Sequence, residues 1–130
     1  MAENNVDVVR RGYEAYRRGD FAAIFALLHP EIEIRQTELL PWGGRYHGYD
    51  GARQFFGALN RHTEALPEPT EYIEGGDTVA AVGRLRGRVR ANDNAFDLAI
   101  VHLWTLRNGQ AVRFEAYIDT PGMLSALAAG

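Results

Sequence analysis

Residues 95–119, AFDLAIVHLWTLRNGQAVRFEAYID, carry the pattern that decides the fold. Two runs rich in β-branched and aromatic residues flank Asn108 and Gly109, a dipeptide that strongly indicates a two-residue β-hairpin turn. A type I′ turn at this dipeptide pairs Arg107 with Gln110, and every later pair follows from that one. The stretch therefore predicts two long antiparallel strands whose register is set at the turn.

This register gives the predicted hairpin two unlike faces. On one face, Leu103 is opposite Phe114. The other members of that face are Thr105, Val112, Val101, Ala116, Ala99 and Ile118. A face so apolar has to be buried, and the helices earlier in the chain are the candidates to cover it. On the opposite face His102 is next to Glu115, either as a polar network on the outer sheet face or at a dimer interface, or as an imidazole oriented by a carboxylate for proton transfer.

Composition and charge exclude several classes of protein. The chain has 130 residues, 46% hydrophobic and 24% charged, which is typical of one soluble globular domain spanning residues 1–130. A formal net charge of -3 gives no general attraction to nucleic acid or to a membrane surface. The chain lacks cysteine and its histidines lack metal-binding spacing, so we expect no metal and no cofactor. Without a signal peptide or a membrane-spanning run, the expected location is the cytoplasm.

The rest of the chain contains helical and extended patterns. Asn4 or Asn5 can cap a first helix that ends at Gly19, and Asp20 can cap a second one. The predicted helices span residues 5–18, 21–28, 51–66 and 123–128, and the predicted strands before the hairpin span residues 31–36, 70–74 and 78–90. Helices segregated to one face of an antiparallel sheet make an α+β fold.

The predicted strand over residues 78–90 alternates small or apolar residues with arginines. A three-residue loop at residues 92–94 would set Leu85 beside Val101 and place Arg84 on the opposite face. That choice leaves the arginines in solvent, whereas a two-residue loop would bury them at a high cost. Such alternation is typical of a solvated strand face with acidic neighbours rather than of a nucleic-acid surface.

Several short motifs along the chain resemble one protein family. They are Tyr13-Glu14-Ala15-Tyr16, Gly19-Asp20-Phe21, Leu27-Leu28-His29-Pro30-Glu31, Tyr46-His47-Gly48, Gly51, Phe55-Phe56, Asn108-Gly109-Gln110 and Glu115-Ala116-Tyr117-Ile118-Asp119-Thr120. By these motifs the chain resembles the SnoaL-like and ketosteroid-isomerase-like branch of the NTF2-like superfamily. The resemblance implies a cone-shaped, curved antiparallel (mixed) sheet wrapped around three N-terminal helices, with a cavity open at one end. It also implies a homodimer formed through the outer face of the sheet.

The resemblance does not carry over a known reaction. The catalytic base of ketosteroid isomerase would correspond to Gln36, whose amide cannot take up a proton at neutral pH. The isomerase's oxyanion tyrosine and its second acid would correspond to Gly12 and Val101. The His and Asp of SnoaL-type cyclases would correspond to Phe114 and Ala116. The sequence therefore predicts a cavity that does not use either mechanism.

The loop over residues 37–49 is rich in aromatic side chains, and loops of this kind often carry binding residues. We expect Trp42, Tyr46 and His47 to lie across the open end of the implied cavity, above Tyr13; the alternative is that they anchor the loop. His47 is the candidate catalytic acid or base, because it is the one side chain of this set that exchanges protons near neutral pH. The predicted ligand-binding residues are Tyr13, Gln36, Trp42, Tyr46, Phe56, Leu103, Phe114 and Ile118.

Tyr13 and Gln36 each allow a purely structural interpretation as well. Tyr13 lies on the apolar stripe of the first helix, where it could pack in the core with a satisfied hydroxyl group. Gln36 is expected to face inward, where its amide either bonds to the backbone or contacts a ligand.

Two functions remain open on the sequence. The first is a small-molecule-binding protein with a hydrophobic cavity, acting as an isomerase, lyase or cyclase on a small apolar or partly polar metabolite. The second is a non-catalytic dimeric module that binds a ligand or a partner. A homodimer would bury Trp104, Tyr117 and His102 on the outer sheet face. An acid or base inside the cavity would favour the first function, and a cavity lined only by Tyr, Trp, Gln and aliphatic groups would favour the second.

Overall fold

The computed structural model describes residues 4–128. Its helices are α1 (Asn5–Arg18), α2 (Phe21–Leu27), α3 (Gly48–His62) and α4 (Thr120–Leu127). Its strands are β1 (Leu28–Gln36), β2 (Gly44–His47), β3 (Thr63–Gly75), β4 (Thr78–Val89), β5 (Ala95–Arg107) and β6 (Gln110–Ile118). Within this part of the chain, the six strands form one sheet in the order β2-β1-β6-β5-β4-β3. Neighbouring strands are antiparallel except β1 and β6, which are parallel.

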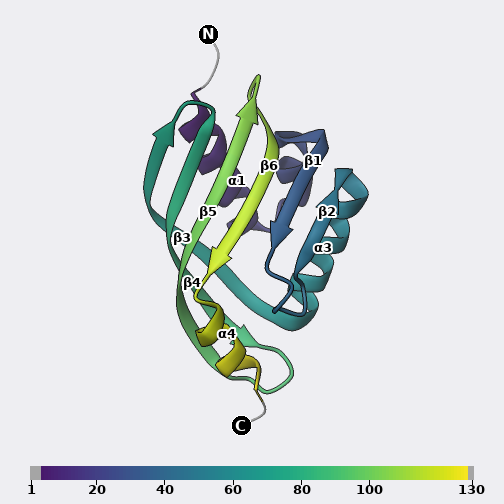
Figure 1. The fold of residues 1–130 in the computed structure, drawn as a ribbon, viewed down its shortest axis with the longest axis vertical. Coiled ribbons are helices and arrows are strands. Elements are labelled where there is room, and N and C mark those ends of the chain that lie inside the picture. The colour runs from purple at the N-terminus through teal and green to yellow at the C-terminus, as the bar shows by residue number, and fades with distance from the viewer. Residues whose placement is uncertain (1–3, 129–130) are drawn as a thin grey trace.

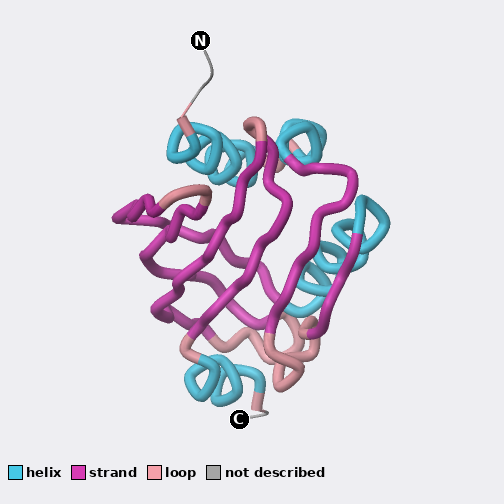
Figure 2. Tube along the Cα trace, turned by 45° about the horizontal axis from the view of Figure 1, so that its top comes forward, coloured by secondary structure: helices cyan, strands magenta, loops and turns pink. Residues whose placement is uncertain are grey.

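The sheet is curved, and helices cover its inner face. In Figure 1, α1 lies behind the sheet, and α4 lies at the end of the molecule near the C-terminus. Helix α1 packs on β3 and β4, while α3 packs on β1 and β2. Figure 2 shows the strands crossing the middle of the molecule with the helices around them. The predicted α+β fold, a curved mixed sheet wrapped around helices, is confirmed.

The first helix has the predicted bounds, and the second begins at the predicted Phe21 but ends at Leu27, one residue before the predicted end. The Asn4 side chain accepts a hydrogen bond from the backbone N–H of Asp7 and caps α1. Gly19 follows α1 with a φ of 70°, a left-handed conformation that a glycine adopts without strain. The Asp20 carboxylate then accepts a bond from the backbone N–H of Ala23 and caps α2.

The third helix begins and ends earlier than predicted, at Gly48 and His62, and the strand after it is longer. We expected a helix over residues 51–66 that the prolines would end, followed by a strand over residues 70–74. Helix α3 instead ends at His62 and β3 begins at once with Thr63, so Pro67 and Pro69 lie inside a strand. The sheet tolerates these prolines because β3 is an edge strand and has a free side for residues without an N–H.

The predicted loop over residues 37–49 contains a short strand. Strand β2 lies antiparallel to β1, with Arg45 opposite Arg35 and Tyr46 opposite Ile34. Strand β1 also begins earlier than the predicted residue 31, at Leu28. Backbone pairing therefore holds the second half of the predicted loop against the end of β1, directly before α3 begins.

The turn that joins β5 to β6 matches the prediction. Asn108 and Gly109 have φ values of 52° and 78°, the positive angles that a type I′ turn requires at both positions. Arg107 is opposite Gln110, as the sequence predicts.

A β-bulge follows this turn immediately. Leu106 is opposite Ala111, but the next residue of β5, Thr105, is opposite Arg113. Val112 is therefore an extra residue in β6 that is not paired with any residue of β5. From this point the pairing is displaced by one residue.

The displacement exchanges the two faces of β5 relative to the prediction, because side chains alternate along a strand. Phe114 is opposite Trp104 and not Leu103, and Leu103 is opposite Glu115. The predicted Leu103–Phe114 pair and the predicted His102–Glu115 neighbours are wrong. His102 lies on the inner face, opposite Ala116.

The pairing of β4 with β5 also differs in register, although the two faces of β4 itself are as predicted. Leu85 is opposite Leu98 and not Val101, because the chain between Val89 and Ala95 is longer than a three-residue loop. The arginines of β4 still lie on the outer face. Their ion pairs are Arg84–Asp97, Arg86–Asp97, Arg86–Glu68, Arg88–Glu64 and Arg88–Asp93.

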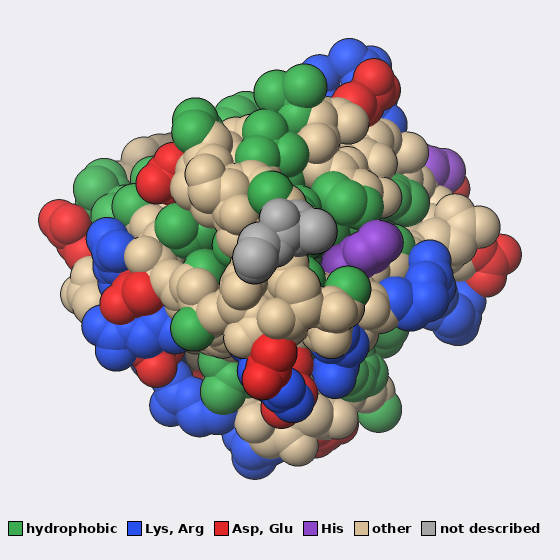
Figure 3. Space-filling model, turned by 90° about the horizontal axis from the view of Figure 1, so that it is seen from below, with side chains coloured by type: hydrophobic (Ala, Val, Ile, Leu, Met, Phe, Trp, Pro, Cys, Tyr) green, Lys and Arg blue, Asp and Glu red, His purple; other side chains and the backbone are tan. Residues whose placement is uncertain are grey.

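The arginines lie among acidic partners, as predicted, and these exposed pairs contribute little to stability. On the face that Figure 3 shows, basic and acidic side chains lie beside one another and hydrophobic side chains are interspersed.

The core consists of two clusters of buried residues. The larger cluster includes Ile32, Ile34, Phe55 and Phe114, and it joins α3 to β1 and β6. The smaller cluster includes Val8 and Val9 of α1, packed against β4 and β5. Among residues 4–128, no helix is both long enough and apolar enough to cross a membrane.

Candidate functional site

An internal cavity of about 100 Å³ lies between the helices and the inner face of the sheet. Most of its wall is apolar. The polar groups on the wall belong to Tyr13, Tyr16, Gln36, Trp42, Thr63, His102 and Trp104. No Asp, Glu or Arg of the described residues lines it. A cavity with a few placed polar groups on an apolar wall is typical of a small-molecule site.

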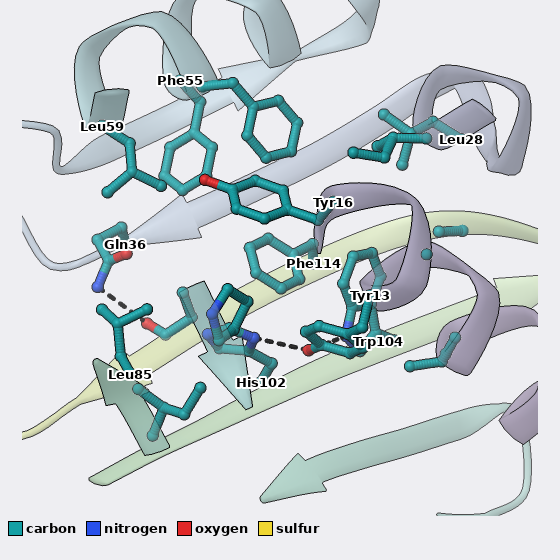
Figure 4. Close-up of a pocket in the computed structure, with 18 of the residues that line it drawn as sticks. Tyr13, Tyr16, Leu28, Gln36, Phe55, Leu59, Leu85, His102, Trp104 and Phe114 are labelled. Atoms are coloured by element: carbon teal, nitrogen blue, oxygen red, sulfur yellow. Dashed lines mark hydrogen bonds between the residues drawn. The ribbon is translucent and has the colours of Figure 1, made fainter. Parts of the chain in front are cut away.

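Three of the polar groups form a hydrogen-bonded chain, visible in Figure 4. The indole N–H of Trp104 donates to the hydroxyl oxygen of Tyr13 over 2.9 Å. The Tyr13 hydroxyl and Nδ1 of His102 are 2.6 Å apart. Helix α1 supplies Tyr13, while β5 supplies both His102 and Trp104, two residues apart on the same face of the strand.

Aromatic packing holds the rings of this chain in place. The ring of Tyr13 is nearly parallel to that of His102, with 5.9 Å between centroids. The Phe114 ring packs edge-on against His102 with centroids 5.0 Å apart, and its centroid is 4.3 Å from that of Trp104. Such contacts leave the imidazole little freedom to turn.

Burial keeps the titratable groups of the wall uncharged. Desolvation lowers the pKa of His102 to about 4, so the imidazole is neutral at neutral pH. Desolvation also raises the pKa of Tyr13, and the hydrogen bond from Trp104 offsets this only in part. The pKa of Tyr16 is raised by burial as well. The wall therefore carries hydrogen-bonding groups but no net charge.

Gln36 lies at the end of β1, and Figure 4 places it across the cavity from Tyr13. Its amide nitrogen is 3.4 Å from the carbonyl oxygen of Ala116, to which it donates. One amide proton is thereby used by the backbone. The second amide proton and the amide oxygen remain for another partner.

Six of the predicted ligand-binding residues line the cavity. They are Tyr13, Gln36, Trp42, Phe56, Phe114 and Ile118. Trp42 is buried in the larger core cluster, so it forms part of the wall and not an exposed lip over the opening. Tyr46, His47 and Leu103 do not line the cavity.

His47 lies on the outside of the molecule, so its predicted position at the cavity is wrong. Its side chain is 64% exposed, and its Nε2 atom is 2.8 Å from a carboxylate oxygen of Glu31. Residues alternate in direction along β2, so Tyr46 points toward α3 and His47 points away. The Tyr46 hydroxyl donates to the carbonyl oxygens of Trp42 and Gly43, which anchors the loop.

Sequence reasoning placed His102 on the wrong face, and a signal for its true position was present. The face that contains His102 also contains Phe96, Leu98, Ile100, Trp104 and Leu106. The side chains of this set are bulkier and more apolar than those of the opposite set, which contains Asp97 and Arg107. Weighing the two faces of β5 alone would have placed His102 inside. Leu103 was assigned to the cavity by the same error.

Residues 4–128 contain no group of three or more His, Asp or Glu side chains placed to hold a metal ion. The polar groups on the cavity wall are suited to hydrogen bonds with an organic ligand.

Comparisons with known proteins identify the family to which this chain belongs. Residues 9–114 match the model of the SnoaL-like domain. Among curated proteins, none matches this chain by sequence. An NTF2-like protein of unknown function from Burkholderia pseudomallei is 32% identical, with a TM-score of 0.91 over 98% of this chain and 99% of that one. An NTF2-like protein from Burkholderia thailandensis is 29% identical, with a TM-score of 0.89 over 97% and 98% of the two chains.

A third solved structure contains an organic molecule. TerC, co-crystallised with polyporic acid, is 27% identical to this chain, with a TM-score of 0.86 over 95% of this chain and 97% of TerC. The family model covers most of the chain, and the structural likeness extends over nearly its full length. The chain belongs to the SnoaL-like family of the NTF2-like superfamily.

Proposed function

We propose that this protein binds a compact, uncharged and largely apolar small molecule in its cavity and acts on it as an isomerase, lyase or cyclase. In this proposal, His102 exchanges a hydrogen bond or a proton with the polar atom of the ligand. The observation that carries the proposal is an imidazole on the wall of an otherwise apolar cavity. The polyporic acid in the TerC crystals supports a small organic ligand.

The wall of the cavity argues for an uncharged ligand. None of the described lining residues is an Asp, Glu or Arg, and the His102 imidazole is neutral because burial lowers its pKa. An ionised ligand would be buried without a counter-charge, and this burial would cost roughly several kcal/mol of binding free energy. A ligand with one or two oxygen atoms on an apolar skeleton meets no such penalty. The volume of the cavity is also similar to that of an engineered apolar cavity of about 150 Å³, which admits benzene.

His102 is also the group that favours chemistry over binding alone. In isomerase, lyase and cyclase reactions of carbonyl compounds, a base removes a proton from a carbon atom and negative charge grows on the carbonyl oxygen. No Asp or Glu of the described residues lines the cavity, so in this proposal water or buffer from the solvent takes up that proton. A placed hydrogen-bond donor stabilises that charge more than it stabilises the ground state. An N–H of His102 aimed at the oxygen would supply this stabilisation in a site of low dielectric constant.

The ligand class can be tested with three probes that share one aromatic ring. They are acetophenone, ethylbenzene and benzoate, and their dissociation constants can be measured by calorimetry or by titration in NMR spectra. We expect acetophenone to bind at least about tenfold more tightly than benzoate, because the cavity offers no counter-charge. Equal or tighter binding of benzoate would refute the uncharged ligand class.

Catalysis can be tested with acetophenone in D₂O. Exchange of its methyl protons for deuterium, followed by proton NMR, reports proton loss next to the carbonyl group. We expect the wild-type protein to accelerate this exchange and His102→Phe to lose about 10²- to 10³-fold, the cost of removing one oxyanion donor. Leu103→Ala is the matched control, because Leu103 is adjacent on β5 but does not line the cavity. If His102→Phe exchanges as fast as the wild type, His102 has no catalytic part.

A non-catalytic binding module is the second candidate. It is favoured by the absence of a carboxylate from the described lining residues and by the low basicity of His102, whose pKa is lowered to about 4. Binding of acetophenone without acceleration of the exchange reaction would support this candidate over the enzyme.

A further inference from the structure

We propose that Tyr13 is a positioning residue that holds His102 in one tautomer, with the proton on Nε2, so that the cavity presents an N–H donor and selects ligands with an acceptor oxygen. This inference rests on the proposed function only in its statement about ligands. The statement about the tautomer concerns the protein alone and can be tested without a ligand.

The direction of the hydrogen bonds follows from Trp104. An indole N–H is a donor only, so the 2.9 Å contact assigns the Tyr13 oxygen as its acceptor. The hydroxyl proton of Tyr13 then points away from Trp104. The acceptor within reach of that proton is Nδ1 of His102, 2.6 Å from the hydroxyl oxygen.

Acceptance at Nδ1 fixes the remaining proton of the imidazole. A neutral imidazole has one protonated and one bare nitrogen, and a bond from Tyr13 requires Nδ1 to be the bare one. The proton is then on Nε2. The alternative tautomer would place the Nδ1 proton against the Tyr13 hydroxyl, whose own proton would lose its partner inside the cavity.

Tyr13 itself is not suited to transfer its proton. Burial raises the pKa of its hydroxyl, and no basic side chain of the described residues lines the cavity apart from His102. Its part is therefore to orient the imidazole, while Nε2 of His102 is the atom that can meet a ligand. In Figure 4, His102 lies between Tyr13 and Trp104 on one side and Gln36 and Leu85 on the other.

As a consequence, the cavity should prefer ligands that carry a hydrogen-bond acceptor. A carbonyl or ether oxygen can accept from Nε2–H, whereas a group that can only donate would face another donor. The preference of the wild-type protein for acetophenone over ethylbenzene, which lacks the oxygen, measures this contact. We expect Tyr13→Phe to reduce that preference by about 2- to 10-fold, the value of one ordinary hydrogen bond.

The tautomer can be read from the imidazole nitrogen shifts in long-range proton–nitrogen NMR spectra of the ligand-free protein at neutral pH. The signals of His102 are assigned as those missing from His102→Phe. We expect Nε2 to show the shift of a protonated nitrogen and Nδ1 that of a bare one. In Tyr13→Phe, the two shifts should move toward each other, because the tautomers then interchange. A structural role of Tyr13 alone would not move these signals.

Tyr16→Phe is the matched control, because it also removes one hydroxyl group from the α1 side of the cavity wall. Its His102 signals should equal those of the wild type. The proposal is overturned by a wild-type imidazole protonated on Nδ1, by an unchanged spectrum in Tyr13→Phe, or by the same change in Tyr16→Phe. If Tyr13→Phe does not fold, the wild-type spectrum alone decides between the two tautomers.

The outcomes separate this inference from the proposed function. An Nε2-protonated His102 in a protein that does not bind acetophenone would refute the ligand class and keep Tyr13 as the positioning residue. Conversely, a protein that binds acetophenone and accelerates its deuterium exchange, but whose His102 is protonated on Nδ1, would keep the ligand class and refute Tyr13 as the positioning residue.

Discussion

His102 is a histidine whose neutral form is enforced by its surroundings, and this has a measurable effect on stability. In the folded protein, burial lowers its pKa to about 4, against an ordinary value of 6.5. Between these values the unfolded chain binds a proton that the folded chain excludes, so stability falls as the pH drops from 6.5 toward 4. We expect this residue to contribute a loss of about 3 kcal/mol over that window.

Urea unfolding of the wild type and of His102→Phe, near neutral pH and near pH 4, measures this contribution. The acid-induced loss of stability should be smaller in His102→Phe, because the variant has no imidazole at this position to protonate on unfolding. Losses of equal size in the two proteins would show that His102 titrates normally in the folded state.

Single residues of the site were predictable only where one element decided their direction. Helical periodicity places Tyr13 on the buried stripe of α1, and strand alternation places Gln36 on the inner face at the end of β1. His102 depends on how β5 pairs with β6, and one residue of displacement was enough to turn it outward in the prediction. His47 depends on a short strand inside a loop, which composition does not reveal.

At the scale of elements, the faces of the β5–β6 hairpin have a direct test. Phe114 is 7% exposed and packs against Trp104 and Phe55. Phe114→Ala should therefore cost about 3–5 kcal/mol in urea unfolding. Leu103→Ala, on the outer face of the neighbouring strand, should cost about 1 kcal/mol or less. Equal costs for the two variants would contradict the face that the structure assigns to each.

The elements themselves followed the sequence closely where a cap or a turn marks their ends. Asn4, Gly19 and Asp20 mark the limits of the first two helices, and Asn108 with Gly109 marks the hairpin. The third helix and β3 were misjudged because prolines were taken as ends of structure, although an edge strand accepts them. The family resemblance implied a mixed sheet, but the order of its strands and the parallel pairing of β1 with β6 were not predicted, because no local pattern in the sequence reveals them.

At the scale of the whole molecule, the outer face of the sheet carries an apolar area that predicts self-association. Val101 is 37% exposed and Tyr117 is 52% exposed, and they are opposite each other on β5 and β6. Val82 is opposite Val101 on the other side, so a row of apolar side chains crosses three strands. The predicted interface cannot use Trp104 or His102, because both lie at the cavity.

We therefore keep the homodimer as a prediction, with its centre moved to Val101. Val101→Glu should convert a dimer to a monomer in light scattering, because the new charge would be buried at the interface without a partner. Leu124→Glu is the control: Leu124 is 40% exposed and lies on α4 rather than on the sheet, so its substitution should leave the dimer intact. A wild-type protein that scatters as a monomer would refute the prediction.

The bulge at Val112 shifts the pairing of β5 with β6 by one residue, as an inserted base shifts a reading frame. It changes no side chain of β5, yet it decides which of two complete sets of side chains faces the interior. One set would give an interior of Ala99, Val101 and Leu103, and the other gives Ile100, His102 and Trp104. In a scaffold of this kind, the gain or loss of one residue beside a hairpin can therefore supply or remove a reactive group in one event, with no substitution at the position that carries it.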